Sequence, residues 1–171
     1  MSEPAPEVVA VALSSCYELV ELTIGAQLSA VASSPGGSLP WPSVPGAVHV
    51  AADGRLEALH FAPGRWLLPE PSAELLAAVA DQSAATLVDT EGKWQRRSLR
   101  GSGAMRLLAA AADVEEMLKG RGCAALSLFD CPAIIARAPG SIELWVQSSY
   151  ARFLDEQLGV VLSRLAGRRE P

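Results

Sequence analysis

The stretch AALSLFDCPAIIARAPGSIELWVQSSYARFLDEQLGVVLSRL, residues 124–165, decides the fold class. It begins with three short apolar runs, at 124–129, 133–138 and 142–147, whose length and composition predict three consecutive β-strands. The serines at 148–149 then begin a helix, because apolar residues recur after them at the spacing of one helical face. The predicted apolar face of this helix consists of Tyr150, Leu154, Leu158, Val161 and Leu165.

The segments before this stretch extend the pattern. Asp53-Gly54 is a strong hairpin signal between two strand-like runs. A helix is predicted over 72–82, and Ser102 can cap a second one. Asp113 has the Asp-x-x-Glu spacing of a capping box for a short helix that ends near Gly120. Strands are predicted at 8–13, 17–24, 47–51, 56–61, 65–68, 86–89 and 94–99.

This order of elements predicts an α+β fold of mostly antiparallel sheets with helices packed on them. Residues 1–6 are rich in Pro and Glu and are expected to form a flexible tail. Residues 7–171 are expected to form a single compact domain, since the chain has 171 residues and suits one domain. A chain of this size buries about 70% of the surface that its unfolded form exposes, so it needs no disulfides for a core.

Composition excludes several classes of protein. Apolar residues make up 50% of the chain and charged residues 19%, which argues against disorder. With 14 basic and 19 acidic residues the formal net charge is −5, which argues against nucleic acid as the main partner. No apolar run reaches the length of a membrane-spanning helix, and the N-terminus carries acid where a signal peptide has Lys or Arg. A cytoplasmic location without membrane contact is therefore expected. The mean hydropathy of +0.23 indicates a large core or a surface covered by another chain.

Two regions are candidates for contact with a partner. Residues 33–46 contain several prolines and glycines, and Trp41 lies between two of the prolines. A rigid loop with an apolar tip is either a surface connector or a docking element. Four arginines between 96 and 106 form either a solvated strand edge or a surface for an anionic partner. The residues that we expect at a partner interface are Leu39, Pro40, Trp41, Arg96 and Arg97.

Catalytic candidates are few. His49 and His60 lie between apolar residues of predicted strands and are interpreted as ordinary strand histidines. No spacing of His and Cys suggests a metal site, and no Gly-x-Ser-x-Gly motif is present. The three cysteines are an odd number and fit reduced, packed thiols, with Cys123 expected to be buried at the start of a strand. We assign no catalytic, cofactor-binding or metal-binding residue.

Four segments of the sequence form a set of motifs in a consistent order. They are Ala62-Pro-Gly-Arg-Trp-Leu-Leu68, Leu99-Arg-Gly-Ser-Gly-Ala-Met-Arg-Leu-Leu108 and Trp145-Val-Gln-Ser-Ser-Tyr-Ala-Arg-Phe-Leu154, together with Ser38-Leu-Pro40. These motifs resemble the gamma subunit of heterotetrameric sarcosine oxidase, which belongs with the aminomethyltransferase (glycine-cleavage T-protein) folate-binding fold group. The first three correspond to the family's Gly-Pro-Asp-Glu-Trp-Leu-Leu, Leu-x-Gly-x-x-Ala-x-x-Leu-Leu and Val-x-Arg-Ser-Phe-Ala-x-Tyr-Leu segments. Gln147 and Arg65 depart from this pattern, because the family has Arg and an acid there.

The resemblance implies a non-catalytic subunit of a complex that oxidises an N-methyl or secondary amino acid. In that family the large alpha subunit holds NAD and a tetrahydrofolate site and contacts gamma. The beta subunit holds FAD and FMN, and the small delta subunit binds zinc. Electrons pass from FAD to FMN, the one-carbon unit passes to tetrahydrofolate, and the gamma subunit carries no cofactor. Two alternatives stay open: a folate-binding one-carbon transfer protein acting alone, and an unrelated protein-interaction module.

Overall fold

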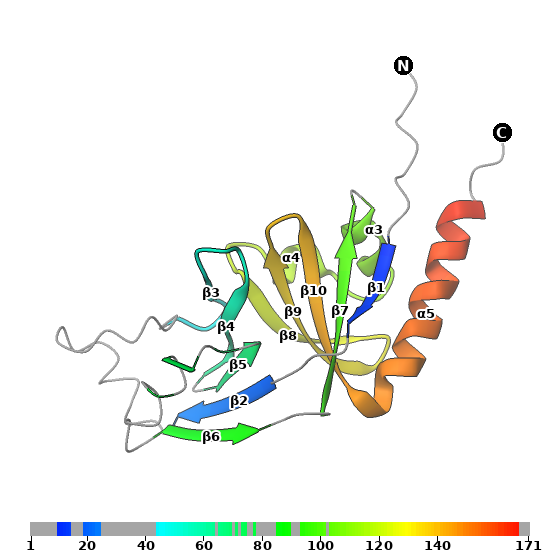
Figure 1. Ribbon diagram of the computed structural model, residues 1–171. Helices are drawn as coiled ribbons and strands as arrows, with labels where there is room; N and C mark the ends of the chain where they lie inside the picture. The colour runs from blue at the N-terminus through cyan, green and yellow to red at the C-terminus, as the bar shows by residue number, and fades with distance from the viewer. Residues whose placement is uncertain are drawn as a thin grey trace.

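A computed structural model shows two antiparallel sheets and a set of helices (Figure 1). The residues that it describes are 10–14, 19–24, 44–63, 65–69, 71, 73–74, 77, 85–89, 93–101 and 103–167. The tail expected at residues 1–6 and most of the helix expected at 72–82 lie outside these ranges. The α+β prediction is confirmed, because runs of strands form two antiparallel sheets and the helices follow as separate elements.

Sheet A is built around the stretch that decided the fold class. Its three C-terminal strands are consecutive and antiparallel, as predicted. The β8–β9 hairpin turns through two residues, Phe129 and Asp130, both with positive φ, the backbone geometry of a tight type I′ turn. In spatial order the sheet consists of β1 (Ala10–Ser14), β7 (Trp94–Arg100), β10 (Ser141–Gln147), β9 (Cys131–Ala138) and β8 (Cys123–Leu128).

Sheet B comes from the first half of the chain and is also antiparallel. The hairpin predicted from Asp53-Gly54 joins its first two strands, with Gly54 at positive φ. Arg55 Nε also donates to the Asp53 carboxylate at 2.6 Å across the turn. In spatial order the sheet consists of β3 (Val48–Val50), β4 (Leu56–Ala62), β5 (Arg65–Pro69), β2 (Leu19–Ile24) and β6 (Ala85–Asp89).

The helices show one departure from the sequence pattern at their N-caps. The α3 helix (Ala104–Leu108) is capped by Gly103 with no side-chain hydrogen bond, and the predicted cap Ser102 lies outside the described residues. The α4 helix (Val114–Met117) is capped as predicted, because the Asp113 carboxylate accepts from the Glu116 N–H. The long helix α5 spans Ser148–Gly167.

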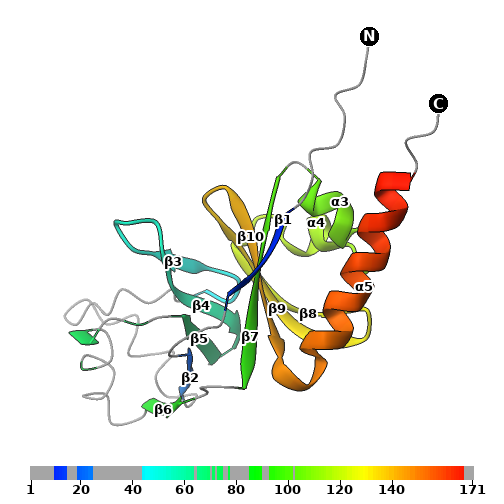
Figure 2. The same ribbon diagram turned by 45° about the vertical axis from the view of Figure 1, so that its right-hand side comes forward.

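The α5 helix covers one face of sheet A, while sheet B lies on the other side of that sheet (Figures 1 and 2). One core cluster fills the space between sheet A and the helices, and Leu154 and Leu158 of α5 are fully buried in it. The prediction for Tyr150 is wrong, because this residue is 40% exposed and does not belong to the core cluster. A second cluster lies between the sheets and contains Leu56, Leu59, Leu67, Trp94, Cys123, Ile134, Ala136 and Trp145.

Two glycines lie at a close backbone contact between the two sheets. The Gly46 carbonyl accepts hydrogen bonds from the Gly122 and Cys123 N–H groups at 2.7 and 3.0 Å, which ties sheet B to the start of β8. Gly46 has φ +93°, a conformation that favours glycine. A Cβ at Gly122 would lie 2.7 Å from Val48 Cγ2, so the backbones approach this closely only without a side chain. The position of one sheet relative to the other therefore depends on this contact.

Candidate partner-binding surfaces

Arg97 lies on the helix-facing side of β7 and forms an ion pair within the chain. Its Nε and Nη2 donate to the two carboxylate oxygens of Asp155 on α5 at 2.7 and 2.8 Å. Only 3% of Arg97 is exposed. This paired geometry is the strongest arrangement that arginine and a carboxylate can form. Arg97 therefore fastens α5 to the sheet and offers almost no surface to a partner.

Arg96 points to the opposite side of β7, because neighbouring strand residues alternate between faces. Its Nε donates to Glu143 on β10 at 2.8 Å, and its guanidinium lies 5.8 Å from the centre of the Trp145 ring. Glu143 is only 2% exposed and also accepts from Ser98 Oγ and Ser141 Oγ at 2.8 and 2.6 Å. The carboxylate thus has hydrogen-bond donors on both oxygens, which makes its burial tolerable.

The outcome differs among the residues that we expected at a partner interface. Leu39, Pro40 and Trp41 lie outside the described residues, which resume at Val44. The anionic-partner interpretation of Arg97 is not supported, because the chain supplies its own acid to that side chain. The sequence offered no means to predict this pairing, since Asp155 is far along the chain on another element. Arg100 and Arg106 remain exposed.

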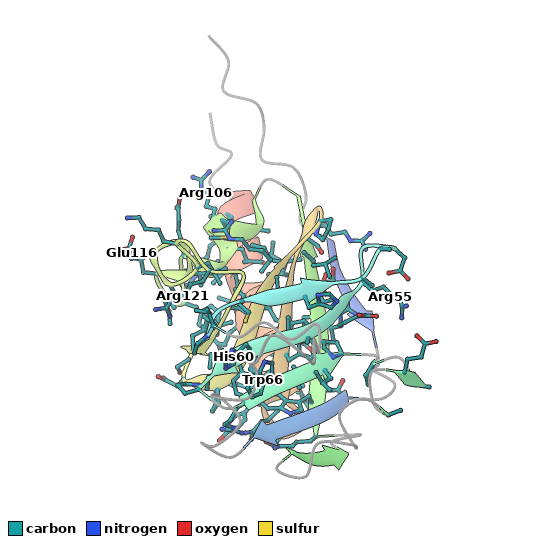
Figure 3. All side chains as sticks on the ribbon, turned by 90° about the vertical axis from the view of Figure 1, so that its left-hand side faces the viewer. Arg55, His60, Trp66, Arg106, Glu116 and Arg121 are labelled. Carbon is teal, nitrogen blue, oxygen red and sulfur yellow. The ribbon has the colours of Figure 1, made fainter. Side chains whose placement is uncertain are left out.

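Next to the end of the proline-rich segment, the surface is hollowed. Val44 is 65% exposed there. A hollow of about 370 Å³ adjoins it, lined by Pro45, Phe61 and Met117 among others. A second hollow of about 620 Å³ shares Glu116, Lys119 and Arg121 with it. Figure 3 shows Glu116 and Arg121 on the same side of the molecule. Both hollows are open to solvent and carry both signs of charge.

Cys123 and the two histidines occupy structural positions. Cys123 is buried at the start of β8, as predicted, and its thiol donates to the Ala47 carbonyl at 3.4 Å. Burial raises its pKa to about 12, so the thiol stays protonated and is a poor nucleophile at neutral pH. His49 pairs with Glu57 at 3.5 Å on the β3–β4 hairpin. His60 is buried and stacks on Trp66 with ring centres 4.1 Å apart (Figure 3).

Apolar side chains also emerge on the outer side of α5. Tyr150, Phe153 and Val160 are 40%, 46% and 43% exposed. They lie on one line along the helix, because their spacings follow the helical repeat. The sequence pattern alone did not reveal this line, because Tyr150 also fits the spacing of the buried face. We call the line the outer stripe; it consists of Tyr150, Phe153, Gln157, Val160 and Arg164.

Within the described ranges, no group of three His, Cys, Asp or Glu side chains is placed to hold a metal ion. The helices in the same ranges include none with the length and apolar character needed to cross a bilayer.

Known proteins resemble this chain in structure but not in sequence. No family model matches the sequence. No curated protein matches it either. A solved structure does match: heterotetrameric sarcosine oxidase from Corynebacterium sp. U-96, in complex with pyrrole 2-carboxylate, with a TM-score of 0.71 and 20% sequence identity. The chain has the fold of a sarcosine oxidase chain.

The match to the sarcosine oxidase chain extends over nearly the whole protein. It covers 92% of this chain and 85% of that chain. The two chains are therefore similar in length as well as in fold. This agreement confirms the fold that the sequence motifs implied, with two antiparallel sheets and helices packed beside them.

Proposed function

We propose that this chain is the gamma-like, non-catalytic subunit of a heterotetrameric flavoenzyme that oxidises an N-methyl or secondary amino acid. The observation that supports this most is the fold, which matches a sarcosine oxidase chain of similar length over 92% of this protein. The ordered motifs in the sequence favour the same subunit independently of the structure. In this proposal the chain contacts a large alpha subunit, and beta and delta subunits complete the cytoplasmic complex.

The chemistry in this proposal belongs to the partner subunits. FAD, FMN, NAD, tetrahydrofolate and zinc are held there, electrons pass from FAD to FMN, and the one-carbon unit passes to tetrahydrofolate. The contribution of this chain is a rigid surface. Its described ionisable groups suit that role: Arg97 and Glu143 are committed to internal contacts, and burial keeps the Cys123 thiol protonated.

The experiment is capture of the tagged chain from its own host, grown so that amine catabolism is induced. We expect large chains to co-elute, with visible flavin absorbance in fixed proportion to the tag. The control is capture of an unrelated tagged protein from the same cells. Recovery of the chain without any flavin-containing chain would contradict the proposal. Tight binding of tetrahydrofolate to the chain alone would instead favour the one-carbon transfer protein.

A further inference from the structure

We infer that the outer stripe of α5 is the surface on which a different chain docks, one that presents apolar side chains followed by acidic groups. This inference rests on the proposed function and names the surface of this chain that the partner subunit covers. It is carried by the exposure of the stripe, by its spacing and by the charges around it.

The outer stripe has the geometry of a helix-packing surface. Its residues follow one another at intervals of 3, 4, 3 and 4 positions, the alternation that keeps side chains facing a neighbouring element along a helix. From Tyr150 to Val160 the stripe extends about 15 Å along the axis, at about 1.5 Å per residue. Arg164 lies one further turn toward the C-terminus and is exposed. The stripe thus has a long apolar part and a cationic end.

Exposed apolar residues are ordinary when they are scattered, so their arrangement matters here. Of the six large apolar side chains exposed among the described residues, three lie on this one stripe. Tyrosine, phenylalanine and arginine are also enriched at interfaces, where they bury a large area with few rotatable bonds. The core cluster contains Leu154, Leu158 and Val161 from this helix, and none of the three apolar stripe residues belongs to it.

The position of α5 leaves the stripe accessible. The helix runs along the outside of the molecule, on the side of sheet A away from sheet B (Figures 1 and 2). The exposed fractions of Phe153 and Val160, 46% and 43%, agree with this placement. A partner can therefore reach the stripe without rearrangement of either sheet.

The charges favour a different chain over a second copy of this one. The stripe itself contains no acidic residue, and the two acids of α5, Asp155 and Glu156, lie off it and are both paired. Asp155 holds Arg97 at 2.7 Å, and Glu156 accepts from Arg152 at 3.0 Å. A second copy packed stripe against stripe would therefore place no carboxylate against Arg164. A partner with apolar side chains against Tyr150, Phe153 and Val160 and its own Asp or Glu against Arg164 complements both parts of the stripe.

The test compares capture of flavin by the wild-type chain and by matched variants in the host. Phe153→Glu and Val160→Glu place a carboxylate in the apolar part, while Val50→Glu makes the same change at an exposed valine of β3. Arg164→Glu alters only the charged end and leaves the packing of the helix untouched. Circular dichroism and the melting temperature of each variant confirm that it is folded.

We expect both apolar variants to lose about tenfold or more of the flavin captured per tag, as for an anchor at the centre of an interface. Arg164→Glu should also reduce capture, and Val50→Glu should not. If all variants capture flavin as the wild type does, the stripe is not the interface, although the proposed function stands. If the wild type itself captures none, the proposed function fails and this inference with it. If the isolated chain is a dimer that Val160→Glu makes monomeric, a second copy occupies the stripe and the inference is wrong.

Discussion

The apolar residues on the two sides of α5 differ in burial, and therefore in what they contribute to the stability of the fold. On the inner side, Leu154 and Leu158 are completely buried against sheet A, and Arg97 adds an ion pair to Asp155 at the border of this face. On the outer side, Phe153 and Val160 are of similar chemistry but remain nearly half exposed. The same helix thus has one face that belongs to the core and a stripe of apolar side chains that stays outside the core.

This difference predicts that the inner face of α5 determines the stability of the chain, whereas the outer stripe determines its assembly with a partner. Removal of a buried side chain costs both the transfer free energy and the cavity that remains, whereas an exposed side chain leaves neither. Substitutions on the inner face should therefore lower the unfolding free energy strongly, and those on the outer stripe should change it little. Four variants of the same helix measure how sharp this separation is.

Leu154→Ala should have the largest effect. The side chain is fully buried in the cluster between sheet A and the helices, and such truncations cost about 2–5 kcal/mol of unfolding free energy. Urea unfolding of the purified chain measures it. A midpoint equal to that of the wild type would show that the inner face is not packed as described.

Asp155→Ala should come next, because it leaves the Arg97 guanidinium buried without its carboxylate. Breaking a fully buried ion pair costs about 3–5 kcal/mol. Since the Asp155 side chain is 33% exposed, water can replace part of the lost contact, and we expect a cost of about 2 kcal/mol. The control is Glu156→Ala, which breaks the exposed pair with Arg152 and should cost about 0.5 kcal/mol or less. Equal costs for the two variants would contradict a buried role for Arg97.

Gly159→Ala should stabilise the chain. The position is exposed within α5, and a Cβ there would meet no atom within 4 Å. Glycine in a helix is less favourable than alanine by about 0.5–1 kcal/mol, so unfolding should require that much more free energy. Gly122→Ala serves as the contrast, because its Cβ would lie 2.7 Å from Val48 Cγ2 and should destabilise the contact between the sheets. Destabilisation by Gly159→Ala would contradict the open surroundings of this position in α5.

Val160→Thr should have the smallest effect on stability. The side chain is 43% exposed and threonine has nearly the same shape, so the unfolding free energy should change by about 0.5 kcal/mol or less. Differential scanning calorimetry is precise enough to resolve a change of this size in the melting temperature. A loss comparable to that of Leu154→Ala would place Val160 in the core and remove the distinction between the two sides.

The sequence predicted the fold well where a pattern was regular. The alternation of short apolar runs located the strands of sheet A, and Asp113 and Asp53-Gly54 located a helix cap and a hairpin by local chemistry alone. Ser102 predicted the N-cap of α3 less well, because the glycine next to it can also take the N-cap position. In the structure the N-cap of α3 is Gly103. Local rules thus succeed where the contact that they describe is itself local.

The surfaces were harder to predict because they depend on contacts between distant residues. Arg96 and Arg97 were adjacent and looked alike in the sequence, yet they point to opposite faces and bind different acids, Glu143 and Asp155. Tyr150 fits two helical lines at once, and only the packing of α5 against sheet A decides that it faces outward. No spacing within the sequence encodes which side of a helix the sheet will cover.

The most direct test of the proposed role is a redox measurement on the captured complex. Wild-type tagged chain is purified from its host with whatever binds it, and sarcosine or another N-methyl amino acid is added without oxygen. The account predicts that the added amine bleaches the flavin absorbance of the complex. It also predicts that material captured with Val160→Glu contains less flavin before any amine is added. A captured complex whose flavin does not respond to any such amine, or a chain that carries no flavin partner, would contradict it.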